Sequence, residues 1–246
     1  MKRIIIIGAS SGLGMEIARE FAELGWRVGI AARRKNRLEE LRDEFPRLME
    51  VEALDVEVPD APARLHNLID SLGGMDVILY AAGTGWYNPR LYPTVEQQTV
   101  AVNVRGFTQI IDTAYHYFVD TNTPGRIAAI TSVAGTKALA VSPAYSASKR
   151  YQWNYLEALD QLAHSCGHNV RFTDLRPGFM DTALLAQDPK SADLPMMMGV
   201  EYAAAKIVKD IIRGRRISYI DWRWHALCAM WQCIPNCLWR RVKVLF

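Results

Sequence analysis

A glycine-rich turn that directly follows an apolar run is the feature that most constrains this chain. The residues Ile4–Ile7 are hydrophobic on both faces, as in a central strand of a parallel sheet. The turn leads at once into a helical apolar pattern that ends near Leu24. When a glycine-rich turn joins a strand to a helix, the backbone N–H groups of the turn and the partial positive charge at the helix N-terminus favour binding of a phosphate. The alternative interpretation is an ordinary tight turn that binds nothing. We therefore predict a phosphate-binding turn made of Gly8, Ser10, Ser11, Gly12, Leu13 and Gly14.

The glycine spacing differs from two other nucleotide-binding motifs. The pattern is G-x3-G-x-G, with glycines at positions 8, 12 and 14. Long-chain dinucleotide enzymes have G-x-G-x-x-G, and nucleoside triphosphatases have G-x4-G-K-[ST]. Because no lysine follows to hold a terminal phosphate, hydrolysis of a nucleoside triphosphate is disfavoured.

Short apolar runs alternate with helical patterns along most of the chain, which is typical of repeated strand–helix–strand units. We predict an α/β fold: a Rossmann-like doubly wound parallel sheet of about seven strands, with helices on both faces. The predicted strands are 4–7, 27–31, 49–54, 77–81, 126–131, 170–175 and 217–220. The predicted helices are 14–24, 36–44, 61–72, 94–119, 145–165 and 201–213.

The composition indicates a folded chain with a large core. Of its 246 residues, 50% are hydrophobic and 22% are charged, which excludes a disordered chain. The formal net charge of +3 is too balanced to indicate nucleic acid as a partner. We expect one domain over residues 1–220 and a hydrophobic, aromatic extension over residues 221–246.

The cysteines and the start of the chain indicate an intracellular setting. Four cysteines in a chain of this length do not make a disulfide scaffold. Cys228, Cys233 and Cys237 lack metal-ligand spacing, so we predict no metal site and expect buried thiols in an apolar tail. The first residues lack the apolar region of a secretory signal, and no uncharged run has the roughly 18–20 residues that span a bilayer. We predict a cytoplasmic protein.

Cations follow the predicted second strand, where NAD enzymes place a carboxylate. The chain reads Ala31-Ala32-Arg33-Arg34-Lys35, with no acidic residue to accept from the ribose hydroxyls. Guanidinium groups instead bind phosphate through paired, charge-assisted hydrogen bonds. We predict NADP(H) in preference to NAD(H), with Arg33 as the main contact and Arg34 or Lys35 assisting. The solvated start of a charged helix is the alternative.

Tyr145 and Lys149 lie four residues apart at the start of a predicted helix, so they share one helix face. An unperturbed phenol has a pKa of about 10, too high for a prompt acid or base at neutral pH. A neighbouring ammonium lowers that pKa, and a shift of about three units corresponds to roughly 4 kcal/mol. Ser132 follows the predicted fifth strand, at the edge where open α/β sheets bind ligands.

These features together resemble the short-chain dehydrogenase/reductase family in its short, single-domain form. The resemblance spans residues 1–220 in outline, and Ser132 stands thirteen residues before Tyr145, as the catalytic serine of that family does. It implies that Ser132, Tyr145 and Lys149 are catalytic, and that Asn103 supports a proton-relay water near Lys149.

The resemblance also implies cofactor contacts beyond the turn. Asp55 matches a residue that touches the adenine, although it is equally suited to cap a helix. Where the family commonly has N-N-A-G, this chain has Tyr80-Ala81-Ala82-Gly83, so hydrogen bonds that steady this strand must come from elsewhere. The implied cofactor-binding residues are Asp55, Val56, Ala82, Gly83, Tyr145, Lys149, Pro177, Gly178 and Thr182.

The predicted function is NADP(H)-dependent interconversion of a ketone and a secondary alcohol by hydride transfer. In the reductive direction Tyr145 donates a proton, Ser132 orients the carbonyl and Lys149 holds the nicotinamide ribose. A non-catalytic NADP(H)-binding regulator is the alternative. The resemblance implies a small-molecule substrate and a homodimer or homotetramer.

Two regions are expected to shape the substrate side. The segment Leu184–Gly199 contains three consecutive methionines and suits a substrate-facing loop or plain core packing. Gly85, Trp86 and Tyr87 are expected to form another wall.

The tail combines Trp222, Trp224, Trp231 and Trp239 with flanking cations. Aromatic residues beside cations suit peripheral contact with a membrane, whereas packing on the same domain or on a partner subunit is the competing interpretation. If the tail contacts a membrane, a hydrophobic or lipid-like ketone is the natural substrate.

Overall fold

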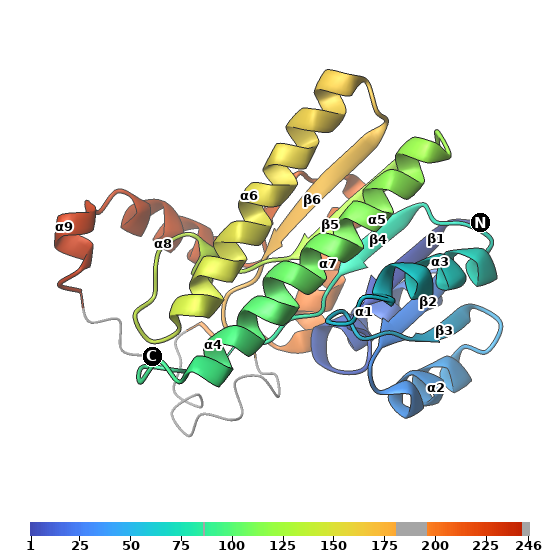
Figure 1. Ribbon diagram of the computed structural model, residues 1–246, viewed down its shortest axis with the longest axis horizontal. Helices are drawn as coiled ribbons and strands as arrows, with labels where there is room; N and C mark the ends of the chain where they lie inside the picture. Colours follow the sequence, from blue (N-terminus) through green and yellow to red (C-terminus); the bar gives the residue numbers. More distant parts are fainter. Residues whose placement is uncertain (86, 181–195, 243–246) are drawn as a thin grey trace.

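One parallel sheet organises the described part of the chain. The computed structural model describes residues 1–85, 87–180 and 196–242. Within these residues the sheet has seven strands in the order β3-β2-β1-β4-β5-β6-β7, and all neighbouring strands are parallel. Helices cover both faces of the sheet (Figure 1). The predicted Rossmann-like doubly wound fold is confirmed.

The elements follow the alternation read from the sequence. The strands are β1 Arg3–Ile7, β2 Arg27–Ala32, β3 Met49–Ala53, β4 Val77–Tyr80, β5 Gly125–Ile130, β6 Val170–Arg176 and β7 Ile217–Tyr219. The helices are α1 Gly12–Glu23, α2 Lys35–Glu44, α3 Ala61–Leu72, α4 Pro93–Val100, α5 Phe107–Asp120, α6 Pro143–Cys166, α7 Val200–Arg213, α8 Trp222–Gln232 and α9 Asn236–Trp239. A π-helical segment, η1, spans Ala101–Gly106, and a short 3-10 segment, η2, spans Val133–Gly135.

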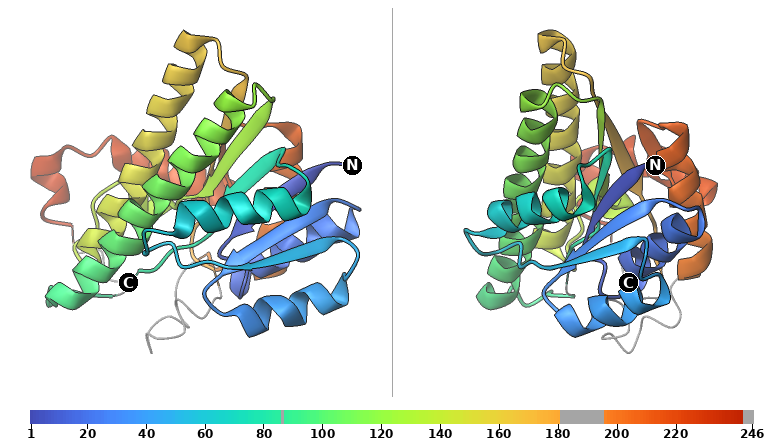
Figure 2. Two further views of the ribbon diagram at one scale, coloured as in Figure 1. Left: turned by 45° about the vertical axis from the view of Figure 1, so that its right-hand side comes forward. Right: turned by 90° about the vertical axis from the view of Figure 1, so that its right-hand side faces the viewer.

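The sheet separates two hydrophobic cores because successive strand side chains point to opposite faces. Ile4 and Ile6 of β1 pack with the apolar sides of α1, α2 and α7. Ile5 and Ile7 pack with α3, α5 and α6 on the other face. Figure 2 shows these two helical layers with the sheet between them. Both faces of β1 are therefore buried, which explains its uninterrupted run of isoleucines.

The strand order changes direction at β1. This strand lies between β2 and β4, so the chain builds one half of the sheet outward from it and then returns to build the other half. In open α/β sheets a crevice forms at the carboxyl ends of the strands at such a switch point. The glycine-rich turn follows β1 at this edge.

The predicted long helical region from about Thr94 to Val119 is confirmed, since the chain is helical from Pro93 to Asp120, but it contains a π-helical segment that the sequence did not predict. The structure divides this region into α4, the π-helical segment η1 and α5. Gly106, the last residue of η1, lies so close to another loop that a Cβ atom there would stand 2.8 Å from the carbonyl oxygen of Val56. The spacing of apolar residues does not reveal the one extra residue that a π-helical turn contains. Such π segments are frequent at functional sites.

The C-terminal helix α8 packs against the same domain. Trp224, Cys228 and Trp231 form a buried stripe that joins Val133 in a third apolar cluster. Trp222 lies off this stripe and is 77% exposed. None of the helices within the described residues combines the length and hydropathy needed to cross a bilayer.

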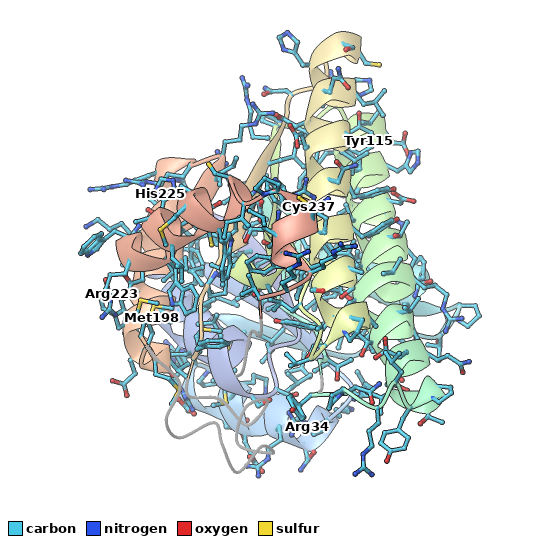
Figure 3. All side chains as sticks on the ribbon, turned by 90° about the vertical axis from the view of Figure 1, so that its left-hand side faces the viewer. Arg34, Tyr115, Met198, Arg223, His225 and Cys237 are labelled. Atoms are coloured by element: carbon cyan, nitrogen blue, oxygen red, sulfur yellow. The ribbon has the colours of Figure 1, made fainter. Side chains whose placement is uncertain are left out.

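The thiols of the tail differ in burial. The expectation of buried thiols is correct for Cys228 and wrong for Cys233 and Cys237, which are exposed. Figure 3 looks onto α8 and α9 and shows Cys237 on the outer helix, α9. The difference arises because Cys228 lies on the buried stripe of α8, whereas Cys233 follows the end of α8 and Cys237 lies on α9, which has no buried residue.

We expect Phe107→Ala to lower the free energy of unfolding by about 3–5 kcal/mol. The Phe107 ring is fully buried and makes edge contacts with Tyr80, Tyr151 and Tyr155, so its removal leaves a cavity between β4, α5 and α6. Urea unfolding followed by circular dichroism measures the loss. Leu162→Ala, at a site on α6 that is 46% exposed, is the control and is expected to cost no more than about 0.5 kcal/mol. Equal losses in the two variants would contradict the assignment of this core.

Candidate active site

A cavity of about 1160 Å³ lies at the carboxyl edge of the sheet. It is bounded by the glycine-rich turn, the end of β2, the loop after β4, the segment η2 and the start of α6. Thr182 and Trp86 lie outside the described residues, as does Leu184–Pro195. The predicted site residues that line the cavity are Gly8, Ser10, Ser11, Gly12, Leu13, Gly14, Arg33, Arg34, Asp55, Val56, Ala82, Gly83, Ser132, Tyr145, Lys149, Pro177 and Gly178.

The glycine-rich turn has the shape that a pyrophosphate requires. Gly8 has a φ of 97°, a conformation that favours glycine, and its N–H donates to the carbonyl of Ala31 at 2.7 Å. A Cβ atom on Gly14 would stand 2.4 Å from the carbonyl oxygen of Gly8. The side chain of Ser11, which precedes α1, makes no capping bond, so the first N–H groups of α1 are available to an anion. These residues fit the phosphates of a dinucleotide.

The three cations after β2 have different surroundings. Arg34 donates to the hydroxyls of Ser10 at 2.9 Å and Ser11 at 2.6 Å, which places its guanidinium beside the turn. Arg33 pairs with Glu57 at 3.4 Å and keeps most of its side chain exposed. Lys35 pairs with Glu39 along α2 and is not among the described residues that line the cavity. Arg33 and Arg34 therefore face the cavity.

Two contacts place Tyr145 at the start of α6. The carboxylate of Glu96 accepts from the N–H of Ala144 at 3.0 Å, and a negative charge there complements the positive helix end. The Tyr145 ring packs on Gly85, where a Cβ atom would stand 2.2 Å from Cδ2. Gly85 and Tyr87 line the cavity, as predicted for this wall.

The environment of Lys149 and Tyr145 changes both pKa values. Burial lowers the pKa of Lys149 to about 8, against the attraction of Asp174. Poor hydration raises the pKa of Tyr145 above its ordinary value, although a hydrogen bond with Ser132 acts in the opposite direction. The predicted lowering of the phenol's pKa is therefore wrong for this structure. The Lys149 ammonium lies 5.8 Å from the centre of the Tyr145 ring and donates to the Ile130 carbonyl at 3.0 Å.

The side chain of Asn103 fixes the loop after β4 through two hydrogen bonds to its backbone. Its Oδ1 accepts from the N–H of Thr84 at 2.9 Å, and its Nδ2 donates to the Thr84 carbonyl at 2.7 Å. The Tyr80 hydroxyl donates to the carbonyl of Val102 at 2.9 Å. These bonds supply the support for Tyr80-Ala81-Ala82-Gly83 that the two missing asparagines do not provide.

Comparison with known proteins identifies the family. The family model for short chain dehydrogenase matches residues 2–193. The chain belongs to the short-chain dehydrogenase family. An uncharacterized oxidoreductase of Myxococcus xanthus is 31% identical over 238 residues, which cover 94% of this chain and 92% of that protein. The predicted family and the oxidoreductase class are confirmed.

Two solved structures share the fold of this short-chain dehydrogenase. A short chain dehydrogenase from Burkholderia cenocepacia, solved in complex with NADP, has a TM-score of 0.82 at 18% identity and covers 100% of both chains. A short chain dehydrogenase/reductase from Burkholderia phymatum, solved in complex with NAD, has a TM-score of 0.82 at 19% identity, covering 93% of this chain and 92% of that chain.

Asp55 does not cap a helix in this short-chain dehydrogenase. Its Oδ1 accepts from the N–H of Glu57 at 3.0 Å, which closes a local turn beside the cavity. The residue before α3 is Asp60, and its side chain makes no capping bond. Asp55 and Val56 are therefore placed at the cavity wall, where the adenine contact was predicted.

Several residues at the site were not predicted from the sequence. Gln152 accepts a hydrogen bond from Lys149 at 3.0 Å. The only feature of the sequence that indicates this contact is the position of Gln152, three residues after Lys149 on the same predicted helix. Asp174 and Arg176 form a buried ion pair at the end of β6, with no distinguishing sequence pattern. Trp224 and Trp231 of α8 line the cavity, whereas the sequence left their partner open. No three His, Cys, Asp or Glu side chains gather as metal ligands within the described ranges.

Lys149→Met tests the cost of the buried ammonium. Between pH 8 and 10.5 the unfolded chain binds more protons than the folded chain, because burial lowers the pKa of Lys149 from 10.5 to about 8. The contribution of Lys149 to the free energy of unfolding is therefore lowest below pH 8 and rises between pH 8 and 10.5. We expect the free energy of unfolding of the wild type, relative to K149M, to rise by about 3 kcal/mol over this pH range. Urea unfolding at several pH values measures this difference. A difference in the free energy of unfolding that stays constant across this pH range would contradict the prediction.

Proposed function

We propose that this chain is an NADP(H)-dependent oxidoreductase that interconverts a ketone and a secondary alcohol. The convergence of Ser132, Tyr145 and Lys149 on one side of the cavity carries the proposal. The glycine-rich turn, which fits a pyrophosphate, lines the same cavity. One cavity therefore has room for the phosphates of a dinucleotide and for a reacting carbonyl next to an acid.

A nicotinamide held in this cavity would supply the hydride for reduction or accept it in oxidation. Tyr145 donates its phenolic proton to the carbonyl oxygen, and its raised pKa keeps it in the acid form that reduction needs. Ser132 has its hydroxyl near the phenol and orients the same oxygen. The side chain of Lys149 extends from α6 to the end of β5, where its ammonium would be held for contact with the ribose.

Two arginines support the preference for NADP(H). Arg33 and Arg34 line the cavity after β2, and the last residues of that strand are alanines. The carboxylate of Glu57, the acid that pairs with Arg33, also accepts from Gln98 at 2.9 Å. We infer that a 2′-phosphate binds the face of Arg34 beside the turn and competes with Glu57 for Arg33.

The cavity walls favour a substrate with apolar groups beside the carbonyl. Val133, Phe179 and Trp224 line the cavity near Ser132, and Leu139 and Trp231 extend this surface. Such walls hold a hydrophobic ketone better than a charged one. A homodimer or homotetramer, a cytoplasmic location and contact of the tail with a membrane remain predictions.

Tyr145→Phe is expected to lower kcat for ketone reduction by about 10²–10⁴-fold, because it removes the general acid. Loss of NADPH absorbance with a panel of steroid, acyl and sphingoid ketones measures turnover, and NADPH fluorescence measures binding, which is expected to persist. Tyr202→Phe, at an exposed site on α7, is the matched control. A wild-type protein that binds NADPH tightly and reduces no ketone would instead favour the regulatory alternative.

Arg33→Asp and Arg34→Ala are each expected to reduce the preference for NADPH over NADH by about 10–100-fold in kcat/KM, because each removes a charge-assisted bond to phosphate. The ratio of kcat/KM for the two cofactors with one ketone is the measurement. Lys35→Ala is the control, because Lys35 pairs with Glu39 and leaves the cavity lining unchanged. An unchanged ratio in both arginine variants would refute the assignment of the 2′-phosphate site.

A further inference from the structure

Gln152 is a buried polar side chain that the mechanism above does not use. It lies three residues after Lys149 on α6, and it is fully buried. Among the described residues that line the cavity, Gln152 is absent. A buried amide that does not face the cavity must find its hydrogen-bond partners inside the protein.

The two ends of the Gln152 amide meet two different parts of the site. Its Oε1 accepts from Nζ of Lys149 at 3.0 Å. Its Nε2 donates to the main-chain carbonyl of Asn103 at 2.9 Å. The amide therefore joins the Lys149 ammonium directly to the π-helical segment η1.

The π-helical segment makes this link possible. Two successive carbonyl groups of η1 accept from side chains: that of Val102 from Tyr80, and that of Asn103 from Gln152. A regular α-helix engages its carbonyls in its own ladder of hydrogen bonds, whereas a π segment interrupts that ladder locally. The π-helical segment between α4 and α5 thus presents an acceptor to α6.

The residue type at position 152 matches both partners. A glutamine offers an acceptor to the ammonium and a donor to the carbonyl. A glutamate would place two acceptors against each other at Asn103, and a methionine would leave Lys149 and Asn103 each short of one bond. Among side chains of this length, the amide satisfies the two groups together.

We propose that Gln152 is a positioning residue, which holds the Lys149 ammonium so that one of its three N–H donors remains for the cofactor ribose. The other two donors are engaged by Ile130 and Gln152 within the described structure. The remaining side of Nζ lies beside Gly83 at the cavity wall. Neither a neutral amide nitrogen nor a carbonyl releases a proton at neutral pH, so this link fixes Lys149 and does not supply protons to it. The inference rests on the proposed function.

The charged and titratable groups around Lys149 are unchanged by Gln152→Met. Asp174 of β6 attracts the ammonium and is itself paired with Arg176, whose Nε donates to it at 2.7 Å. Tyr145 is the titratable neighbour on α6. In Gln152→Met, which adds no charge, a change in the titration of Lys149 is therefore a change in the bond between these two residues.

Gln152→Met and Gln152→Glu are expected to shift the titration of Lys149 in opposite directions. Methionine removes an acceptor from the ammonium, so Lys149 loses its proton at lower pH. Glutamate adds a negative charge beside it, so Lys149 keeps its proton to a pH higher by about 1–3 units. NMR of the cofactor-free protein with ¹³C-labelled lysine measures both midpoints, and K149M identifies the signal.

Kinetics with NADPH and a ketone give the second readout. We expect Gln152→Met to lower kcat about tenfold with little change in the KM of the ketone, because Gln152 lies behind Lys149 and outside the cavity wall. The alkaline limb of the pH profile of kcat is expected to move to lower pH in Gln152→Met and to higher pH in Gln152→Glu. Gln161→Met, at an exposed site on the same helix, is the control and is expected to change none of these quantities.

Each outcome separates this inference from the proposed function. Unchanged Lys149 midpoints and an unchanged alkaline limb in both variants would overturn the positioning role. If Gln152→Met does not fold, a Lys149 midpoint that stays in place in the isosteric Gln152→Glu overturns the role, because it would show that side chain 152 does not contact the ammonium. A wild type that reduces no ketone would refute the proposed function, while the NMR titration would still test the bond between Lys149 and Gln152.

Discussion

The buried ammonium of Lys149 is the constraint on which the active site depends. A charge removed from water must be met by hydrogen-bond acceptors, or it is lost through a shift in pKa. Both effects are present: Ile130 and Gln152 accept from Nζ, and burial lowers the pKa of Lys149 to about 8. Because Ile130 ends β5, this bond ties α6 to the edge of the sheet. Tyr145, one turn earlier, is thereby placed over the same edge.

The architecture brings the other parts of the site to that edge. All strands are parallel, so their carboxyl ends open on the same side, and the change of direction at β1 leaves a crevice there. Glycines allow the close approaches that the crevice needs. A Cβ atom on Gly85 would collide with the Tyr145 ring, and one on Gly178 would stand 2.0 Å from Nε1 of Trp224. Side chains at either position would displace groups that face the cavity.

The C-terminal helix extends the cavity beyond the part that the family model matches. The match ends at residue 193, whereas Trp224 and Trp231 of α8 contribute to the cavity wall. Trp231 is held by a hydrogen bond from its indole to Thr136, just after η2. The cavity wall of this chain is thus partly built from its own tail, while Ser132, Tyr145 and Lys149 lie in the part that the family model matches.

The sequence by itself determined the layered fold, the glycine-rich turn at the cavity and the placement of Ser132, Tyr145 and Lys149 at the same cavity. These follow from local patterns: the apolar period of strands and helices, glycine at fixed offsets and two residues on one helix face. Only the tertiary structure decided the π-helical segment η1, the packing of α8, and Gln152 as the partner of Lys149. Only the structure, too, gave the raised pKa of Tyr145. Burial depends on elements far apart in the chain, and so does the bond from Gln152 to the Asn103 carbonyl that fixes the Gln152 amide beside Lys149, because burial is a property of packed neighbours and not of a residue's place in the sequence.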